Sequence, residues 1–293
     1  MILVAGGTGR LGTLLVGRLV ERGESVRVLT RNRSRAAHLP AGVERVIGDV
    51  RDAGSLAPAA AGVDVVVSAV HGFVGTGDVS PATVDRDGNA NLVDAATAAG
   101  ADIVLVSVVA AAADSPMELF RMKHAAERHA LTSGAPTTIV RSTAFLELWL
   151  DILLDTAKNS GRPVVFGRGE NPINFVSARD VAALVDLVIA DPATRGATLD
   201  IGGPANLTFN ELAAALLDAG HVRGGPRHVP LLVLRVTANT VGRLKPQLGR
   251  QMRAALAMDR IDLRFDSTAI HERLPGLPTT SFADVLGVRV PGE

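Results

Sequence analysis

The sequence contains neither cysteine nor tyrosine among its 293 residues. Without cysteine, the chain has no disulfide, no thiolate nucleophile and no Cys-ligated zinc or iron–sulfur site. Without tyrosine, it has no phenol, so mechanisms in which the protein supplies a phenol proton are excluded. The seven histidines also lack the spacing of metal ligands, and we expect no metal site.

Net charge is also missing, because 30 Lys and Arg residues balance 30 Asp and Glu residues. We therefore expect no general attraction to nucleic acid or to anionic lipid. The charge is uneven, however, since residues 221–258 hold seven basic residues and no acid. This segment is either an anion- or nucleic-acid-binding arm or a set of solvated helix faces. Its lack of base-stacking aromatics favours the second interpretation.

Targeting signals and long apolar runs are absent as well. Met1 is followed directly by apolar residues, without the basic segment of a signal peptide. The longest apolar run, over residues 103–113, is shorter than the roughly 20 residues that span a bilayer. We therefore expect a cytoplasmic protein with no membrane partner.

The chain is rich in hydrophobic residues, at 47%, which is far too apolar for a disordered protein. Short Val- and Ile-rich runs alternate with helical segments, as in strands buried on both faces of a parallel sheet. The predicted strands cover residues 2–5, 25–30, 43–47, 64–69, 102–108 and 137–141. The predicted helices cover residues 11–22, 34–39, 56–60, 83–99 and 117–133. Helical runs are followed by Gly23, Gly62, Gly100 and Gly134, where left-handed C-caps are expected.

This alternation predicts an α/β fold with a doubly wound parallel sheet of the Rossmann type. The rhythm changes after Arg141. Helices are predicted there at 145–158, 179–190 and 210–219, with short strands at 164–166 and 198–201. We predict a dinucleotide-binding domain over residues 1–159 and a smaller α/β substrate-side region over residues 160–293.

A glycine-rich turn follows the first predicted strand and opens the first predicted helix. Its residues are Gly6, Gly7, Thr8, Gly9, Arg10, Leu11 and Gly12. Such glycines allow a tight turn and a close backbone approach to a pyrophosphate, which the helix N-terminus then attracts. A Gly-x-Gly-x-x-Gly pattern alone is weak evidence, but its place in a strand–helix–strand unit indicates dinucleotide binding.

The end of the second predicted strand indicates which dinucleotide binds. NAD sites usually carry an acid there for the ribose 2′-hydroxyl, whereas this chain has Arg31 and Arg33 and no acid. Arginines can hold a 2′-phosphate, so NADP(H) is favoured over NAD(H). The alternative is that both arginines only flank a solvated turn.

Several segments together resemble the NmrA-like family of atypical short-chain dehydrogenases/reductases, which have an NAD(P)-binding Rossmann fold. The resemblance covers nearly the whole chain. It rests on residues 6–12, 29–32, 48–52, 87–96, 174–182, 201–204 and 207–212. It implies that loops after the strands line the cofactor, with Asp49 and Val50 at the adenine. The other implied contacts are Ser68, Ala69, Val70, Ser107, Ser142, Thr143 and Phe145.

The same resemblance exposes a departure at the active site. Short-chain dehydrogenases typically use Tyr-x-x-x-Lys on one helix, and Lys123 matches the lysine while Leu119 stands at the tyrosine position. Lys123 binds ribose, assists proton transfer or is a solvated lysine. Ser107 contacts nicotinamide or substrate, or it bonds its own backbone. His71 and Trp149 are candidate substrate contacts, with a plain loop and a plain core role as their alternatives.

Without a phenol, reduction of an ordinary ketone loses its usual acid, while a quinone or conjugated carbonyl needs a weaker one. We therefore expect an NADP(H)-dependent oxidoreductase that transfers hydride to a small apolar acceptor of that kind. The alternative is a non-catalytic NAD(P)-binding redox sensor with a regulatory protein partner.

Overall fold

The computed structural model describes residues 1–289, which divide into two compact units. The first unit comprises Met1–Ser142 and Ala178–Ile201, and the second comprises Thr143–Ser177 and the chain from Gly202 onward. These units differ from the single break predicted after residue 159. The chain leaves the first unit after Ser142 and returns to it, because Thr198–Ile201 pairs with the sheet of the first unit.

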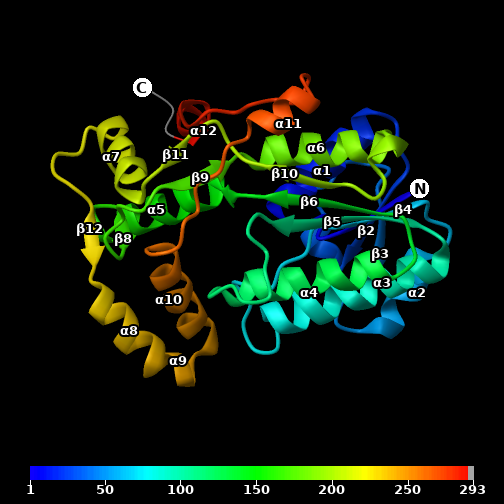
Figure 1. Ribbon diagram of the computed structural model, residues 1–293, viewed down its shortest axis with the longest axis horizontal. Helices are drawn as coiled ribbons and strands as arrows, with labels where there is room; N and C mark the ends of the chain where they lie inside the picture. The colour runs from blue at the N-terminus through cyan, green and yellow to red at the C-terminus, as the bar shows by residue number, and fades with distance from the viewer. Residues whose placement is uncertain (290–293) are drawn as a thin grey trace. The chain divides into compact units, whose positions relative to one another are not determined.

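A seven-stranded sheet forms the centre of the first unit (Figure 1). Its strands are β1 (Ile2–Ala5), β2 (Val26–Thr30), β3 (Glu44–Ile47), β4 (Val65–Ser68), β5 (Asp102–Val108), β6 (Thr137–Ser142) and β10 (Thr198–Ile201). The order is β10-β6-β5-β4-β1-β2-β3, and all neighbours are parallel. The predicted doubly wound parallel sheet is therefore confirmed.

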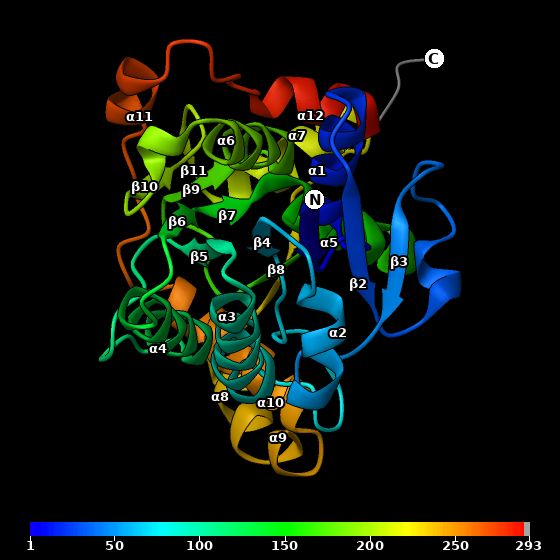
Figure 2. The ribbon, with the colours of Figure 1, turned by 90° about the vertical axis from the view of Figure 1, so that its right-hand side faces the viewer.

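Helices cover both faces of this sheet, with α1 and α6 on one face and α2, α3 and α4 on the other (Figure 2). Their bounds are α1 (Arg10–Glu21), α2 (Leu56–Ala60), α3 (Asp87–Ala99), α4 (Glu118–Thr132) and α6 (Ala178–Ala190). Short 3-10 turns lie at Arg33–Ala36, Ala53–Ser55 and Pro192–Thr194, and a π-helical turn lies at Pro81–Arg86. The helix predicted at 34–39 is thus a single 3-10 turn. The helix predicted at 83–99 is split between the π-helical turn and α3.

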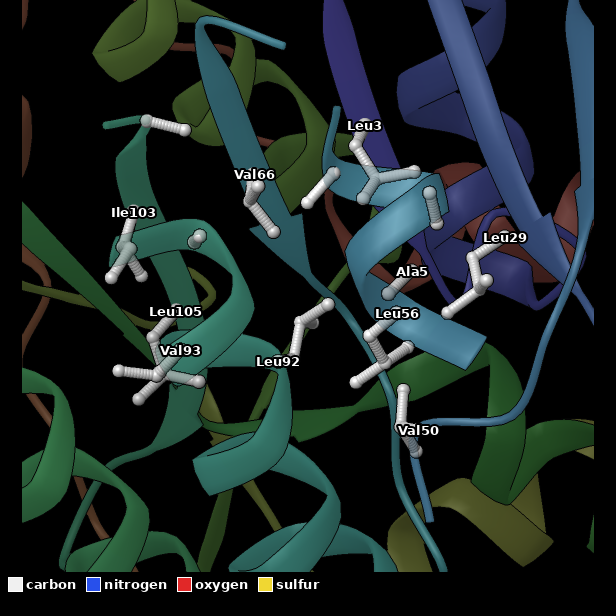
Figure 3. Close-up of a cluster of buried hydrophobic side chains, with 14 of the residues drawn as sticks. Leu3, Ala5, Leu29, Val50, Leu56, Val66, Leu92, Val93, Ile103 and Leu105 are labelled. Atoms are coloured by element: carbon white, nitrogen blue, oxygen red, sulfur yellow. The ribbon is translucent and has the colours of Figure 1, made fainter. Parts of the chain in front are cut away.

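One core cluster of the first unit lies between the sheet and helices α2, α3 and α4. Leu3, Leu56, Leu92 and Leu105 are among its buried side chains (Figure 3). Strands buried on both faces need no polar alternation, which explains their continuous apolar runs. Positive φ values occur, as predicted, at Gly23, Gly62, Gly100 and Gly134.

The second unit contains two small sheets and seven helices within the described residues. A three-stranded sheet has the order β11 (Asn206–Leu207), β9 (Ile173–Val176) and β7 (Ala144–Phe145), and β12 (Arg227–Val229) pairs with β8 (Val164–Phe166). The helices are α5 (Leu146–Ser160), α7 (Phe209–Ala219), α8 (Leu231–Asn239), α9 (Val241–Leu244), α10 (Pro246–Met258), α11 (Thr268–Arg273) and α12 (Phe282–Arg289). The basic segment 221–258 therefore forms β12 and three helices. Nowhere in residues 1–289 is a helix both long and apolar enough to cross a membrane.

Candidate functional site

The carboxyl ends of four neighbouring strands of the first unit form one edge of the sheet. The order β6-β5-β4-β1 places these ends side by side, with Ala5 opposite Ser68 and Val108 opposite Ser142. The strand order reverses between β1 and β4, and such switch points bind ligands in open α/β sheets. The edge brings together four of the predicted cofactor segments, which lie at 6–12, 68–70, 107 and 142.

The glycine-rich turn connects β1 to α1 at this edge. Gly6 has a φ of +88°, and its carbonyl oxygen accepts a 2.9 Å hydrogen bond from the Gly9 N–H. Gly9 is the N-cap of α1, no side chain caps the helix, and its first turn contains no acid. The N-terminus of α1 therefore presents its N–H groups and partial positive charge without a side-chain competitor.

Two of these glycines are required by close backbone contacts. A Cβ atom on Gly6 would lie 2.5 Å from the carbonyl oxygen of Ala69, and one on Gly12 would overlap the carbonyl oxygen of Gly6. Gly17, in the same helix, has open space around the equivalent position. The turn is thus held close to both β4 and α1, which is possible because these glycines have no side chain. We call the turn from Gly6 to Gly12 the glycine cradle.

The end of β2 presents two exposed arginines. Arg31 and Arg33 are both exposed, and the loop between them is fixed because the Asn32 side chain accepts a 2.9 Å hydrogen bond from the Ser34 N–H. No ion pair holds either arginine within residues 1–289. The arrangement is compatible with 2′-phosphate binding and equally with a solvated turn.

Asp49 follows β3 and is tied to its own loop. Its carboxylate forms a 2.7 Å ion pair with Arg51 and accepts a 3.0 Å hydrogen bond from the Arg51 N–H. The hydrogen bond from the Arg51 side chain lowers the pKa of Asp49 most, and the charge of Arg31 adds a smaller effect. Asp49 is therefore an ionised acceptor at neutral pH, next to buried Val50.

A buried polar chain extends behind the β4 end. The Ser68 hydroxyl donates to the side-chain oxygen of Asn89, and the Asn89 amide donates to the Asp85 carbonyl oxygen at 2.8 Å. The Asp85 carboxylate in turn accepts a 2.8 Å hydrogen bond from the Gly72 N–H. Because the Ser68 hydroxyl is engaged in this way, only the main chain of Ser68 is available to contact a cofactor. Ala69 and Val70 stay candidate contacts beside it.

Lys123 of α4 reaches the same place and is 4% exposed. Its ammonium donates to the carbonyl oxygens of Val70 at 2.9 Å and Val106 at 3.1 Å, which connects the ends of β4 and β5. It also lies 3.1 Å from Oδ1 of Asp85, an oxygen that lacks an aligned hydrogen-bond donor. The contact is therefore mainly Coulombic, and the ammonium lies among these three oxygens. The solvated-lysine alternative is wrong, because the side chain is buried.

Ser107 near the end of β5 has a buried hydroxyl, with the residue 2% exposed. This hydroxyl has no hydrogen-bond partner, so the alternative in which it bonds its own backbone is not what the structure shows. A buried hydroxyl without a partner costs free energy. Such an atom at a ligand-binding edge is a candidate contact for a bound group.

His71 lies in the loop after β4, two residues beyond Ala69. The residue is exposed by its accessible surface. Neighbouring protein atoms still remove water from the ring, and this desolvation lowers the pKa of the imidazole, while the Asp85 carboxylate opposes that shift. A neutral imidazole here can accept or relay a proton.

Three predicted residues belong to the second unit. Thr143 donates to the Asn174 side chain at 3.0 Å, and Phe145 is half-buried in β7. The Trp149 ring lies edge-on to Phe209 with centroids 4.8 Å apart. Trp149 is thus part of the aromatic packing of this unit, and its contact with substrate stays a prediction.

The sequence interpretation missed Asp85 and gave Asn89 no role. A signal was present, because Asp85, Asn89, Leu92, Val93 and Ala96 share the spacing of one helix face. All of them are buried. Two polar residues on an otherwise apolar helix face indicate buried partners. Asp85 lies in the π-helical turn at Pro81–Arg86. Such turns are frequent at functional sites.

Comparisons with known proteins agree with this geometry. Residues 6–192 match the family model described as NAD(P)H-binding. The chain is 29% identical to the NAD(P)H azoreductase of Xenophilus azovorans, over 97% of this chain and 96% of that protein.

Two solved structures share the fold at 22% identity. The NADPH-dependent quinone oxidoreductase of Escherichia coli, in complex with NADPH, has a TM-score of 0.80 and covers 99% of both chains. The triphenylmethane reductase of Citrobacter sp., in complex with NADP(H), has a TM-score of 0.79 and covers 98% of this chain and 99% of that one. Because the family model spans more than half of the chain, the protein belongs to the NAD(P)H-binding family, as an oxidoreductase of the NmrA-like, atypical short-chain dehydrogenase/reductase type.

Proposed function

We propose that the protein is an NADPH-dependent reductase that transfers hydride to a small apolar acceptor, such as a quinone or a conjugated carbonyl. The observation that carries this proposal is the glycine cradle combined with an apolar residue at the position one helical turn before Lys123, where a phenol would stand. Leu119, at the tyrosine position, is apolar and half-buried. Relatives named azoreductase and quinone oxidoreductase support the acceptor class.

The residues present fit a dinucleotide. The cradle at Gly6 and Gly12, which a side chain would fill, accommodates the pyrophosphate at the N-terminus of α1. Arg31 and Arg33 hold the 2′-phosphate, and Asp49 accepts from the adenine. The buried Ser107 hydroxyl and the Lys123 ammonium serve the nicotinamide half. When bound, the nicotinamide supplies the hydride.

The protein's own part in the reaction is positioning. Reduction of a simple ketone produces a strongly basic alkoxide, which requires a positioned acid. A quinone or conjugated carbonyl yields a less basic oxyanion that water can protonate, directly or with His71 as a relay. We expect the charged Lys123 to help stabilise the negative charge that develops on the acceptor. Reduction of such an acceptor therefore needs no phenol from the protein.

The acceptor preference tests this proposal. We expect NADPH oxidation with a small naphthoquinone or an enone to exceed that with an aliphatic ketone of similar size by about 100-fold or more, the usual contribution of a positioned acid. Initial rates at matched acceptor concentrations measure it. Equal turnover of the simple ketone would show that the protein supplies an acid we have not identified.

The two arginines after β2 set the cofactor preference. We expect Arg31→Ala/Arg33→Ala to weaken NADPH binding by about 10- to 100-fold, since charged hydrogen bonds to the phosphate are lost, and to leave NADH binding nearly unchanged. Titration of both cofactors measures this. Arg35→Ala, an exposed arginine in the same turn, is the matched control and keeps wild-type affinities. Equal losses for NADPH and NADH would contradict the assignment.

Ser107 offers an independent check on where the cofactor binds. We expect Ser107→Ala to leave the cofactor-free protein equally or more stable, because an unpartnered buried hydroxyl is removed, while NADPH affinity falls by about 2- to 10-fold. The control is Ser133→Ala, whose hydroxyl donates to Ala130 at 2.8 Å. That change lowers stability without altering affinity. Loss of stability in Ser107→Ala with unchanged affinity would refute the contact.

A further inference from the structure

The outward faces of α8 and α9 in the second unit are apolar. Leu244 is 88% exposed and Leu232 is 67% exposed, and both are unusual for large aliphatic side chains. Val233, Val236 and Val241 are exposed beside them. We call these five residues, together with the exposed Arg235, Arg243 and Lys245, the α8–α9 surface.

This surface is not the side by which the two helices pack. Leu234 and Ala238, on the opposite face of α8, are buried. In α9, Gly242 is buried, and a Cβ atom on it would lie 2.6 Å from the Gly249 Cα of α10. Helices α8, α9 and α10 lie together in Figure 1. Each short helix therefore has its inner face satisfied while an apolar face remains turned outward.

The chain segment that carries this surface has charges of one sign only. Residues 221–258 contain seven basic residues and no acid, and three of the cations border the exposed aliphatic side chains. A second copy of the chain packed through the same surface would bring like charges together, at a cost. An anionic lipid surface offers both missing partners, because acyl chains bury the aliphatic groups and headgroup phosphates pair with the cations.

We propose that the α8–α9 surface binds the face of an anionic lipid bilayer, with the aliphatic side chains at the headgroup–acyl boundary. The association is peripheral and crosses no membrane. It departs from the expectation drawn from the zero net charge of the whole chain, because the local charge and apolarity decide binding at a surface. The proposal is independent of the reductase activity.

Vesicle flotation of the full-length protein tests this proposal. We expect co-flotation with vesicles of phosphatidylcholine and phosphatidylglycerol, little with phosphatidylcholine alone, and weaker binding as salt rises. Leu232→Ser/Leu244→Ser lowers the affinity for anionic vesicles by about tenfold or more. Arg243→Gln/Lys245→Gln lowers it by about 20-fold.

Leu131→Ser is the matched control, since Leu131 is an exposed leucine of α4 in the first unit, and it binds vesicles like the wild type. Thermal unfolding of each variant confirms that it is folded. Absence of wild-type flotation with anionic vesicles would overturn the proposal, and so would flotation that neither double variant weakens. A dimer in sedimentation that Leu232→Ser/Leu244→Ser dissociates, without vesicle binding by the wild type, would assign the surface to a second copy.

Discussion

Gly12→Ala is expected to lower the affinity for NADPH by about 100-fold or more. The added methyl group meets the carbonyl oxygen of Gly6 and lies 2.6 Å from the Gly7 Cα. Both obstacles are backbone atoms, so the turn itself has to move away from the proposed pyrophosphate position. Overpacking of this kind also lowers the free energy of unfolding by about 1–3 kcal/mol. Calorimetric titration and denaturant unfolding measure the two effects.

Gly17→Ala is the control for this prediction. It lies in the same helix, and nothing lies within 4 Å of the added methyl group. Because alanine is the better helix former, we expect unchanged NADPH affinity and a gain of about 0.5–1 kcal/mol in stability. NADPH binding by Gly12→Ala at wild-type affinity would show that the cofactor does not approach this turn.

Lys123→Met is expected to destabilise the protein by about 3–5 kcal/mol, the typical cost of breaking a buried ion pair from one side. The Asp85 carboxylate is fully buried and loses its counter-charge, while the carbonyl oxygens of Val70 and Val106 lose their donor. Methionine preserves most of the volume, so the loss reports on charge and hydrogen bonding. Denaturant unfolding measures it.

The double variant Lys123→Met/Asp85→Leu separates the ion pair from packing. Removing both charges replaces the pair with apolar groups, which is often neutral or stabilising. We expect the double variant to be more stable than Lys123→Met alone by about 1 kcal/mol or more. We expect both variants to bind NADPH more weakly than the wild type, because the ends of β4 and β5 are no longer joined. Wild-type stability of Lys123→Met would contradict the buried arrangement.

Most of the first unit could be predicted from the sequence. The six strands predicted in residues 2–141 lie within one residue of their observed bounds, because strands buried on both faces leave continuous apolar runs. The helix ends at Gly100 and Gly134 were equally readable, since a left-handed residue is easiest for glycine. These signals are local, so they do not depend on knowing the rest of the fold.

Other features depend on residues far apart in the chain. The pairing of β10 with β6 returns residues 178–201 to the first unit, and no local pattern encodes that return. The pairing of Asp85 with Lys123 is found only when α4 brings Lys123 against the π-helical turn. The sequence therefore predicted Lys123 as a functional lysine, while its contacts with Val70, Val106 and Asp85 required the structure.

Single-turnover oxidation of NADPH tests the central claim most directly. The protein, in excess over NADPH, is mixed with a small quinone, and the loss of NADPH absorbance is followed with ordinary NADPH and with NADPH deuterated at the transferred position. We predict complete oxidation of the bound cofactor and a slower reaction with the deuterated form, because hydride transfer is the step observed. Tight binding of NADPH without oxidation by quinones or conjugated carbonyls would contradict the account and identify a dinucleotide sensor instead.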